Sequence, residues 1–196
     1  MMIISFIGFM GCGKSSVGRR LSQLLCCPFI DLDQVIEERA GRTIPEIFAR
    51  DGESAFRQRE LEALKSVVHS ASHDAKIATI QSSGPRQATR MVVASGGGAV
   101  MTPGCAEILQ AETMCIYLRA SIDTLVEHLE GQTDGRPMLQ GAELRERIER
   151  LMGERSDTYE ANAHMIIDID GKNIDEIGAE IADSILYLQS NQINEL

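Results

Sequence analysis

The stretch GFMGCGKS, residues 8–15, matches the pattern G-x-x-x-x-G-K-S without a gap. An apolar run over residues 3–7 precedes it, and an amphipathic segment over residues 14–25 follows it. A buried strand before such a loop and a helix after it are the context in which the loop binds phosphate. Its glycines allow backbone N–H groups to turn inward, and the helix N-terminus adds the positive end of its dipole. The stretch therefore predicts a nucleoside triphosphate site.

The last residues of this loop carry side chains with specific expected roles. Lys14 is expected to reach the β and γ phosphates, and the hydroxyl of Ser15 is expected to ligate Mg²⁺. Cys12 lies within the loop, where we interpret it as a tolerated small side chain rather than as a redox-sensitive thiol. The residues expected to contact ATP here are Gly11, Cys12, Gly13, Lys14, Ser15 and Ser16.

Length and composition indicate one globular domain covering residues 1–196, with 43% hydrophobic residues. The net charge of −10 argues against a non-specific nucleic-acid or membrane binder, because such proteins are normally basic. It does not exclude a small anionic substrate, since local arginines can override the overall sign. No run approaches the roughly 18 apolar residues of a membrane span. Five cysteines, with no metal-binding spacing, favour a reducing, cytoplasmic setting.

Short apolar runs alternate with longer amphipathic segments, which predicts a three-layer α/β/α fold around a parallel sheet of about five strands. Strands are expected at residues 3–7, 28–32, 91–94, 113–118 and 165–169, and helices at residues 14–25, 54–68, 121–130, 142–152 and 175–188. Thr43, followed by Pro45 and Glu46, is typical of a capped helix start. The polar residues 70–90 are expected to be a solvated excursion. Residues 131–141 are either a plain loop or a substrate lid.

A phosphate loop alone does not select a function. A GTPase would need the guanine-reading N-K-x-D, which the chain lacks. The D-x-x-G at residues 168–171 is then interpreted as a coincidence. A motor ATPase would have a mid-chain strand that ends in a metal-binding aspartate, but here that strand runs into SGGG at residues 95–98.

A pair of acids stands at the end of another predicted strand, PFIDLD at residues 28–33. Because side chains alternate along a strand, Asp31 and Asp33 are expected on the same side of it. Such a pair suits one carboxylate near Mg²⁺ and one that accepts hydrogen bonds from a substrate hydroxyl. The similar MIIDID at residues 165–170 is interpreted as helix-cap or turn acids.

Three arginines are candidates for binding anions. Arg57 and Glu60 are three residues apart on a predicted helix and can therefore pair, beside an apolar wall of phenylalanines. Arg136 lies in a glycine-bounded loop, where a lid arginine can neutralise charge that develops on a transferring phosphoryl group. Arg155 follows the next helical pattern and is a candidate second anion clamp.

In order and combination, these segments resemble the shikimate kinase family over nearly the whole chain. The matching pieces are GFMGCGKSSVGRRL, FIDLD, IPEIF with GESAFRQRE, SGGGAV, GRPML and ERSDTYEANA. The resemblance implies transfer of the γ-phosphoryl group of ATP to the 3-hydroxyl of shikimate, in aromatic amino-acid biosynthesis. It implies a mobile lid over about residues 128–141 and a catalytic set of Lys14, Asp33 and Arg136.

The same resemblance implies the remaining roles at the site. Ser15 ligates Mg²⁺ directly and Asp31 through water. Shikimate is bound by Asp33, Arg57, Gly96, Gly97, Gly98 and Arg155. A side chain at Gly97 is expected to block shikimate more than ATP. The protein is expected to act as a monomer on these two small molecules, without nucleic acid or membrane.

The chain departs from the family pattern near the lid. Members commonly carry an arginine that stacks on adenine about two turns before the lid arginine, whereas Leu129 stands at that place here. Lys172 and Asn173 are our candidates for the remaining base contacts, and Lys172 is counted with the ATP-binding residues. Two other functions stay open: a phosphate-loop kinase of another small metabolite, such as gluconate or a nucleotide, and a nucleotide-binding regulatory module without catalysis.

Overall fold

The computed structural model describes residues 2–78, 89–130 and 143–194. These residues form one five-stranded sheet in the order β2-β3-β1-β4-β5, and every neighbouring pair is parallel. Each strand lies within two residues of its expected bounds, which confirms the predicted parallel sheet. The strands are β1 (Met2–Ile7), β2 (Phe29–Asp31), β3 (Thr89–Ala94), β4 (Met114–Arg119) and β5 (Met165–Asp168).

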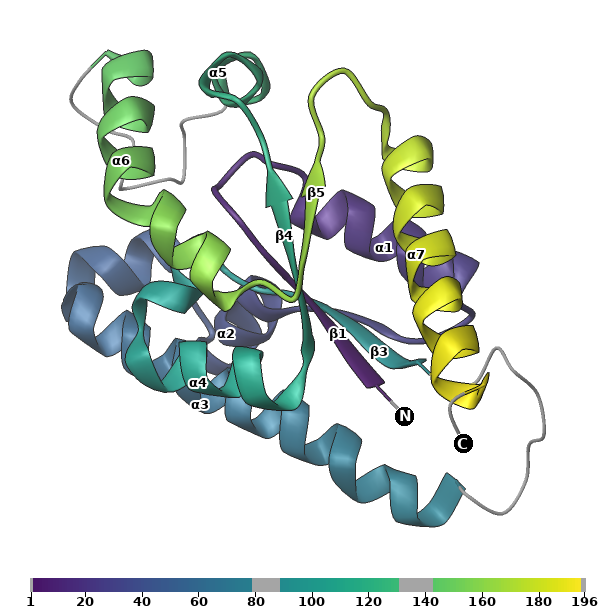
Figure 1. The fold of residues 1–196 in the computed structure, drawn as a ribbon. Helices are drawn as coiled ribbons and strands as arrows, with labels where there is room; N and C mark the ends of the chain where they lie inside the picture. Colours follow the sequence, from purple (N-terminus) through teal and green to yellow (C-terminus); the bar gives the residue numbers. More distant parts are fainter. Residues whose placement is uncertain (1, 79–88, 131–142, 195–196) are drawn as a thin grey trace.

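Helices cover both faces of the sheet, so the predicted three-layer architecture is confirmed (Figure 1). Alternation along β1 sends Ile4 and Phe6 into one core and Ile3 and Ile7 into the other. The first core is closed by α1 (Lys14–Leu24), α5 (Ile122–Leu129) and α7 (Ile174–Asn194). The second is closed by α2 (Leu32–Ala40), α3 (Ile44–Ala78) and α4 (Pro103–Glu112). Helix α6 (Leu144–Asn162) contributes side chains to both.

Helix α3 overturns the expectation of a solvated excursion that starts at residue 70. It begins directly after Thr43, whose N–H and hydroxyl both donate to the carboxylate of Glu46, and it continues to Ala78. The backbone leaves helical geometry only at Gly52, where φ is 81°. A long helix thus occupies the first part of the expected insertion, and residues 79–88 lie outside the described residues.

The segment after β2 also differs from the expectation. The strand ends at Asp31, and Leu32 already begins α2, so period-two alternation does not relate Asp31 to Asp33. Asp31 is instead the N-cap of this helix, and its side chain accepts a hydrogen bond from the N–H of Asp33. This capping arrangement places both carboxylates at the carboxyl end of the sheet. Helix α4 and the short 3-10 turn η2 (Ala99–Met101) were not predicted.

In a parallel sheet every strand ends at the same edge, so the segments that follow the strands meet there. The phosphate loop follows β1, Asp31 ends β2, and the three glycines follow β3. The connection to α7 follows β5 at the same edge. In the parts of the chain that the structure describes, no helix is both long enough and apolar enough to cross a membrane.

Candidate active site

An open pocket of about 840 Å³ lies at this edge of the sheet. The loop after β1 forms its floor, the turn after β3 forms one wall, and α5 with the start of α7 forms the opposite wall. Residues of the phosphate loop, Asp33, the turn after β3 and the segment after β5 therefore meet at one place, whereas Arg57 and Arg155 are not among the lining residues. The pocket is lined by Met10, Gly11, Cys12, Gly13, Lys14, Ser15, Ser16, Val17, Asp33, Ser95, Gly97, Glu127, His128, Ile169, Lys172, Asn173, Ile174 and Ile177.

The loop over residues 8–15 has the geometry of an anion cradle. Its glycines Gly8, Gly11 and Gly13 all have positive φ, at 138°, 82° and 86°. Lys14 is 8% exposed, and its Nζ donates to the carbonyl oxygens of Gly8 and Phe9, each at 2.9 Å. Helix α1 starts at Lys14, and the first N–H groups of a helix have no intrahelical partner. The floor of the pocket thus combines a positive side chain with backbone donors.

Ser15 and Asp31 form an oxygen-rich pair beside this loop. The hydroxyl of Ser15 donates to Oδ2 of Asp31 at 2.6 Å, and both side chains are at least partly open to solvent. Carboxylate oxygens and waters, together with substrate phosphates, are the ligands that Mg²⁺ prefers in proteins. The donor set of this pair therefore fits the expected magnesium ion.

Asp33 is a strongly perturbed acid in the pocket. Burial, followed by the negative charge of Asp31, raises its pKa to about 6, and the positive charge of Lys14 opposes the rise. Its Oδ1 is buried and has no hydrogen-bond partner among the described residues. A buried acceptor without a hydrogen-bond partner lowers the stability of the fold. This oxygen is therefore suited to accept a hydrogen bond from a hydroxyl group of a ligand.

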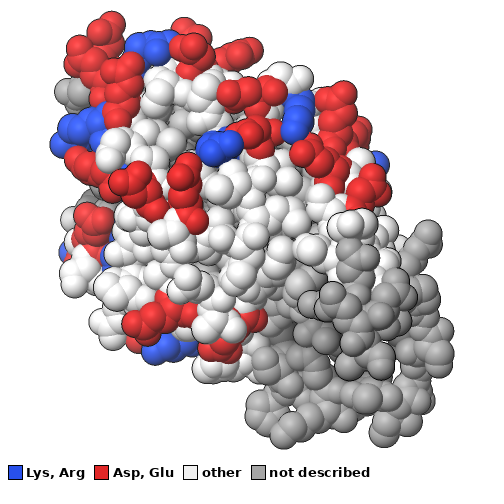
Figure 2. Space-filling model, viewed as in Figure 1, with Lys and Arg blue, Asp and Glu red and all other residues white. Residues whose placement is uncertain are grey.

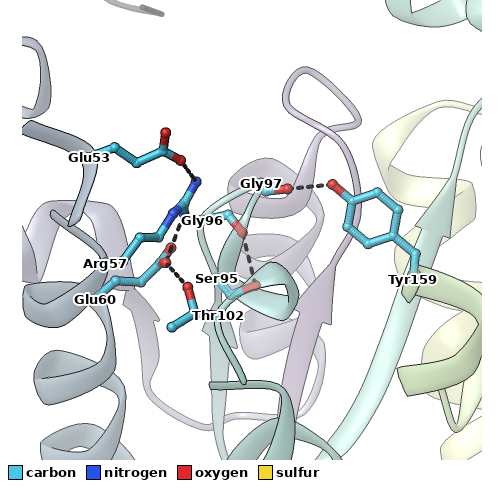
Figure 3. A network of polar contacts seen from close by, with 8 residues as sticks. All are labelled: Glu53, Arg57, Glu60, Ser95, Gly96, Gly97, Thr102 and Tyr159. Atoms are coloured by element: carbon cyan, nitrogen blue, oxygen red, sulfur yellow. Dashed lines mark hydrogen bonds and ion pairs between the residues drawn. The ribbon is translucent and has the colours of Figure 1, made fainter. Parts of the chain in front are cut away.

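A polar network joins α3 to Thr102, the residue before α4 (Figure 3). Arg57 donates to Glu60 at 2.9 Å and to Glu53 at 3.1 Å, while Thr102 donates to Glu60 at 3.4 Å. Glu60 is completely buried, and this burial raises its pKa despite the attraction of Arg57. The expected Arg57–Glu60 pair is therefore confirmed, as a largely buried pair rather than as part of a solvated helix face.

The glycines after β3 make room for these side chains. A Cβ at Gly96 would lie 2.6 Å from Oε1 of Glu60, and a Cβ at Gly98 would lie 2.6 Å from Nη2 of Arg57. A Cβ at Gly97 would instead lie 3.0 Å from the backbone nitrogen of Met10 in the phosphate loop. This last contact argues against the expectation that a side chain at Gly97 would act mainly on the acceptor, because it would press on the nucleotide loop.

Helix α6 carries Arg155 and Tyr159, and Tyr159 contacts the turn after β3. Arg155 is 6% exposed, and Tyr159 is buried with its hydroxyl donating to the carbonyl oxygen of Gly97 (Figure 3). The ring of Tyr159 stacks on that of Tyr117, with 5.1 Å between the centroids. We did not anticipate Tyr159 from the sequence, although its position one helical turn after Arg155 puts both on one face of the helix.

The predicted nucleotide-base contacts have a mixed outcome. Lys172 and Asn173 both line the pocket, but Lys172 pairs with Glu180 at 2.6 Å and Asn173 caps α7 through the N–H of Glu176. Leu129, at the place of the usual arginine, is fully buried against Gly11. Arg136, and with it most of the expected lid, lies outside the described residues.

Buried cations lie at the site although the surface around it is mostly acidic. Acidic side chains outnumber basic ones on the upper part of the face in Figure 2, where Figure 1 places α5, α6 and the start of α7. Three cations, Lys14, Arg57 and Arg155, are at least largely buried at the pocket or beside it. Charges removed from solvent interact more strongly than surface charges. These three side chains are therefore the groups of the site that can bind an anion, although the chain is acidic overall.

The fold and the site together define the class of phosphate-loop kinases that act on small molecules. A family model described as shikimate kinase matches residues 10–186. Shikimate kinase of Dictyoglomus turgidum is 35% identical over 184 residues, which cover 93% of this chain and 96% of that protein. Shikimate kinase of Geobacter metallireducens is 39% identical over 174 residues, which cover 89% and 86%. The chain belongs to the shikimate kinase family.

Solved structures agree with this assignment. Shikimate kinase from Acinetobacter baumannii, in complex with shikimate, aligns with a TM-score of 0.82 at 29% identity and covers 95% of this chain and 94% of that one. A gluconokinase from Sinorhizobium meliloti aligns with a TM-score of 0.50 at 16% identity, which shows a likeness of fold alone.

Proposed function

We propose that this chain transfers the γ-phosphoryl group of ATP to the 3-hydroxyl of shikimate, giving shikimate 3-phosphate and ADP. The observation that carries the proposal is the position of Asp33, whose buried and unpartnered Oδ1 lies between an anion cradle and a buried arginine network. A hydroxylated acid needs both a hydrogen-bond acceptor for its hydroxyl and a cation for its carboxylate, and the site offers both. The product belongs to the biosynthesis of aromatic amino acids.

The nucleotide end of the site is assigned to the phosphate loop. Its N–H groups and Nζ of Lys14 hold the phosphates of ATP, with contacts from the glycines, Cys12, Ser15 and Ser16. Ser15 would hold Mg²⁺ directly and Asp31 would hold it through water, which their 2.6 Å contact supports. When bound, the ion neutralises charge on the phosphate oxygens. Lys172 contributes at the base end of the pocket.

The acceptor end is assigned to the glycine turn and the arginines. Arg57 and Arg155 bind the shikimate carboxylate, because a guanidinium matches a carboxylate with paired donors. Gly96, Gly97 and Gly98 are assigned to present backbone to the ring, and their lack of side chains also leaves room for Glu60, Met10 and Arg57. Tyr159 fixes the orientation of this turn through the carbonyl of Gly97.

The catalytic step depends chiefly on positioning and on charge. Asp33 accepts the hydrogen bond of the attacking hydroxyl and so orients it toward the γ-phosphate, and its raised pKa near 6 makes it able to take the proton as the new bond forms. Lys14 stabilises the charge on the transferring group. Arg136 is assigned to the same task from the lid over about residues 128–141, whose closure would exclude water.

We also propose that the protein works as a monomer in the cytoplasm, as a single catalytic domain over residues 1–196. All five cysteines are free in the structure, which supports a reducing setting.

A coupled assay of ADP release tests the proposed reaction. With ATP and Mg²⁺ present, shikimate, gluconate and AMP are supplied in turn as acceptors. We expect turnover with shikimate alone. Turnover only with gluconate or AMP would make the protein a different small-molecule kinase. Nucleotide binding without turnover on any of the three would favour a regulatory module.

A further inference from the structure

His128, at the end of α5 where the expected lid begins, contacts the phosphate loop. It lies in the last turn of α5, and its ring lines the pocket while remaining open to solvent. Its Nδ1 lies 2.9 Å from the carbonyl oxygen of Gly11. A carbonyl oxygen only accepts hydrogen bonds, so Nδ1 carries the proton of this contact.

This contact holds a peptide plane of the phosphate loop from one side. The carbonyl of Gly11 and the N–H of Cys12 belong to the same planar peptide unit and point in opposite directions. The carbonyl receives His128, and the N–H of Cys12 donates to the carbonyl oxygen of Phe9 at 3.3 Å. Hydrogen bonds thus fix both ends of this peptide unit before any nucleotide binds. The phosphate loop is therefore preorganised at this point.

Leu129 adds an apolar contact at the same point. It is fully buried, and three of its carbons lie 2.8–3.2 Å from where a Cβ at Gly11 would stand. The end of α5 therefore rests directly on Gly11, which keeps the backbone that carries His128 next to the loop.

The opposite edge of the imidazole is then available to a ligand. Nδ1 and Nε2 point in roughly opposite directions, and Nδ1 is engaged by Gly11. In a neutral imidazole with its proton on Nδ1, Nε2 is a hydrogen-bond acceptor. The phosphates of ATP offer no donor to it, whereas the ribose hydroxyls and the amino group of adenine do.

We propose that His128 is a nucleotide-recognition residue, which positions the phosphate loop through Gly11 and accepts a hydrogen bond from the nucleoside part of ATP through Nε2. It would supply a polar contact on the side of the pocket where Leu129 replaces the usual arginine. The inference rests on the proposed function only in taking ATP as the nucleotide.

Two variants distinguish the contribution of Nδ1 from that of Nε2. The amide nitrogen of His128→Asn can replace Nδ1 against Gly11 but leaves nothing at Nε2, whereas His128→Ala removes both. Binding of ADP, inorganic pyrophosphate and shikimate is measured by calorimetry, with His69→Asn as the matched control, since His69 pairs with Glu112 away from the pocket. Retained shikimate affinity verifies folding.

For His128→Asn we expect ADP affinity to fall about 2–10-fold, the worth of one neutral hydrogen bond, with pyrophosphate binding unchanged. For His128→Ala we expect pyrophosphate binding to weaken as well. Unchanged ADP binding in both variants, or an equal loss of ADP and pyrophosphate in His128→Asn, would overturn the nucleoside contact. Unchanged pyrophosphate binding in His128→Ala would overturn the positioning role.

Analogues of ADP identify the donor: the 2′-deoxy and 3′-deoxy forms, and the form without the 6-amino group. We expect one of them to bind the wild type about as weakly as ADP binds His128→Asn, with no further loss when the two changes are combined. Additive losses for all three analogues would contradict the proposal. These measurements involve no turnover, so a failure of the shikimate reaction would leave their result intact.

Discussion

Asp33 and Glu60, from two different helices, turn unpartnered carboxylate oxygens toward the same glycine. A Cβ placed on Gly96 would lie 2.6 Å from Oε1 of Glu60 and 3.0 Å from Oδ1 of Asp33. Both oxygens are buried and have no hydrogen-bond partner in the described part of the chain. Because the two negative charges oppose each other's ionisation, this closeness adds to the effect of burial on the pKa of Asp33.

The raised pKa of Asp33 predicts a pH-dependent gain of stability in Asp33→Asn. A group whose pKa is higher in the folded state binds its proton more tightly there, so folding loses stability as pH rises from about 4 to about 6. The rise from 3.8 to about 6 corresponds to about 3 kcal/mol. In urea unfolding at pH 7, we expect the free energy of unfolding of Asp33→Asn to exceed that of the wild type by up to this amount. Below pH 4, we expect the two values to be equal. A difference that does not change with pH would contradict this account.

The same carboxyl group predicts the acid limb of the rate profile. If Asp33 must be ionised to receive the hydroxyl proton, kcat/KM for shikimate falls about tenfold per pH unit below its pKa of about 6. Steady-state rates at saturating ATP check this, and Asp33→Asn should lose most of its turnover while still binding ADP. A profile that stays flat down to pH 5 would remove Asp33 from proton transfer.

Alanine at the glycine turn should damage catalysis in two distinguishable ways. Gly96→Ala displaces the carboxylates of Asp33 and Glu60, so we expect kcat to fall by up to about 100-fold, the cost of an ångström-scale misplacement. Gly98→Ala displaces the guanidinium of Arg57, so the KM for shikimate should rise instead. Gly153→Ala is the matched control, because its Cβ meets no atom within 4 Å and alanine favours a helix. Equal kinetics for the Gly96 and Gly98 variants would contradict the division of roles.

How far the sequence predicts this molecule depends on whether the signal is local. The phosphate loop, the five strands and the Arg57–Glu60 pair follow from patterns within a few residues, and all three are confirmed. The acids after β2 were expected together for the wrong reason, since helix capping at Asp31 rather than strand alternation brings Asp33 into the pocket.

Contacts between distant segments could not be predicted in this way. The hydrogen bond from Tyr159 to Gly97 and that from His128 to Gly11 join residues 62 and 117 positions apart. Such pairs arise from the order of the strands and from the helix that packs over each strand end, which no periodicity encodes. The extension of α3 to Ala78 was not predicted, because a polar composition resembles that of a loop even where the chain is helical.

The buried Arg57–Glu60 pair predicts that, in a double-mutant cycle, the free energy of unfolding and the affinity for shikimate respond differently. Arg57→Ala should weaken shikimate binding strongly with ADP binding nearly unchanged, and should also cost about 1–3 kcal/mol because Glu60 is left buried without its partner. Adding Glu60→Gln should restore most of the stability but none of the affinity. Arg59→Ala, on the same helix with a more exposed pair to Asp51, is the control. Equal losses of shikimate and ADP in Arg57→Ala would count against its assigned role.

The contact between Ser15 and Asp31 predicts how the reaction depends on metal. Chelation should abolish turnover, and Mg²⁺ should restore it, because the charge on the phosphate oxygens must be neutralised. Since Asp31 is assigned to hold the ion through water, Asp31→Asn should raise the Mg²⁺ needed for half-maximal rate about 10–100-fold. Ser15→Ala should raise it further, because a direct ligand is lost. Glu38→Gln, exposed on the same helix as Asp33, is the control. Rates that respond to Mg²⁺ identically in Asp31→Asn and the wild type would exclude Asp31 from the metal site.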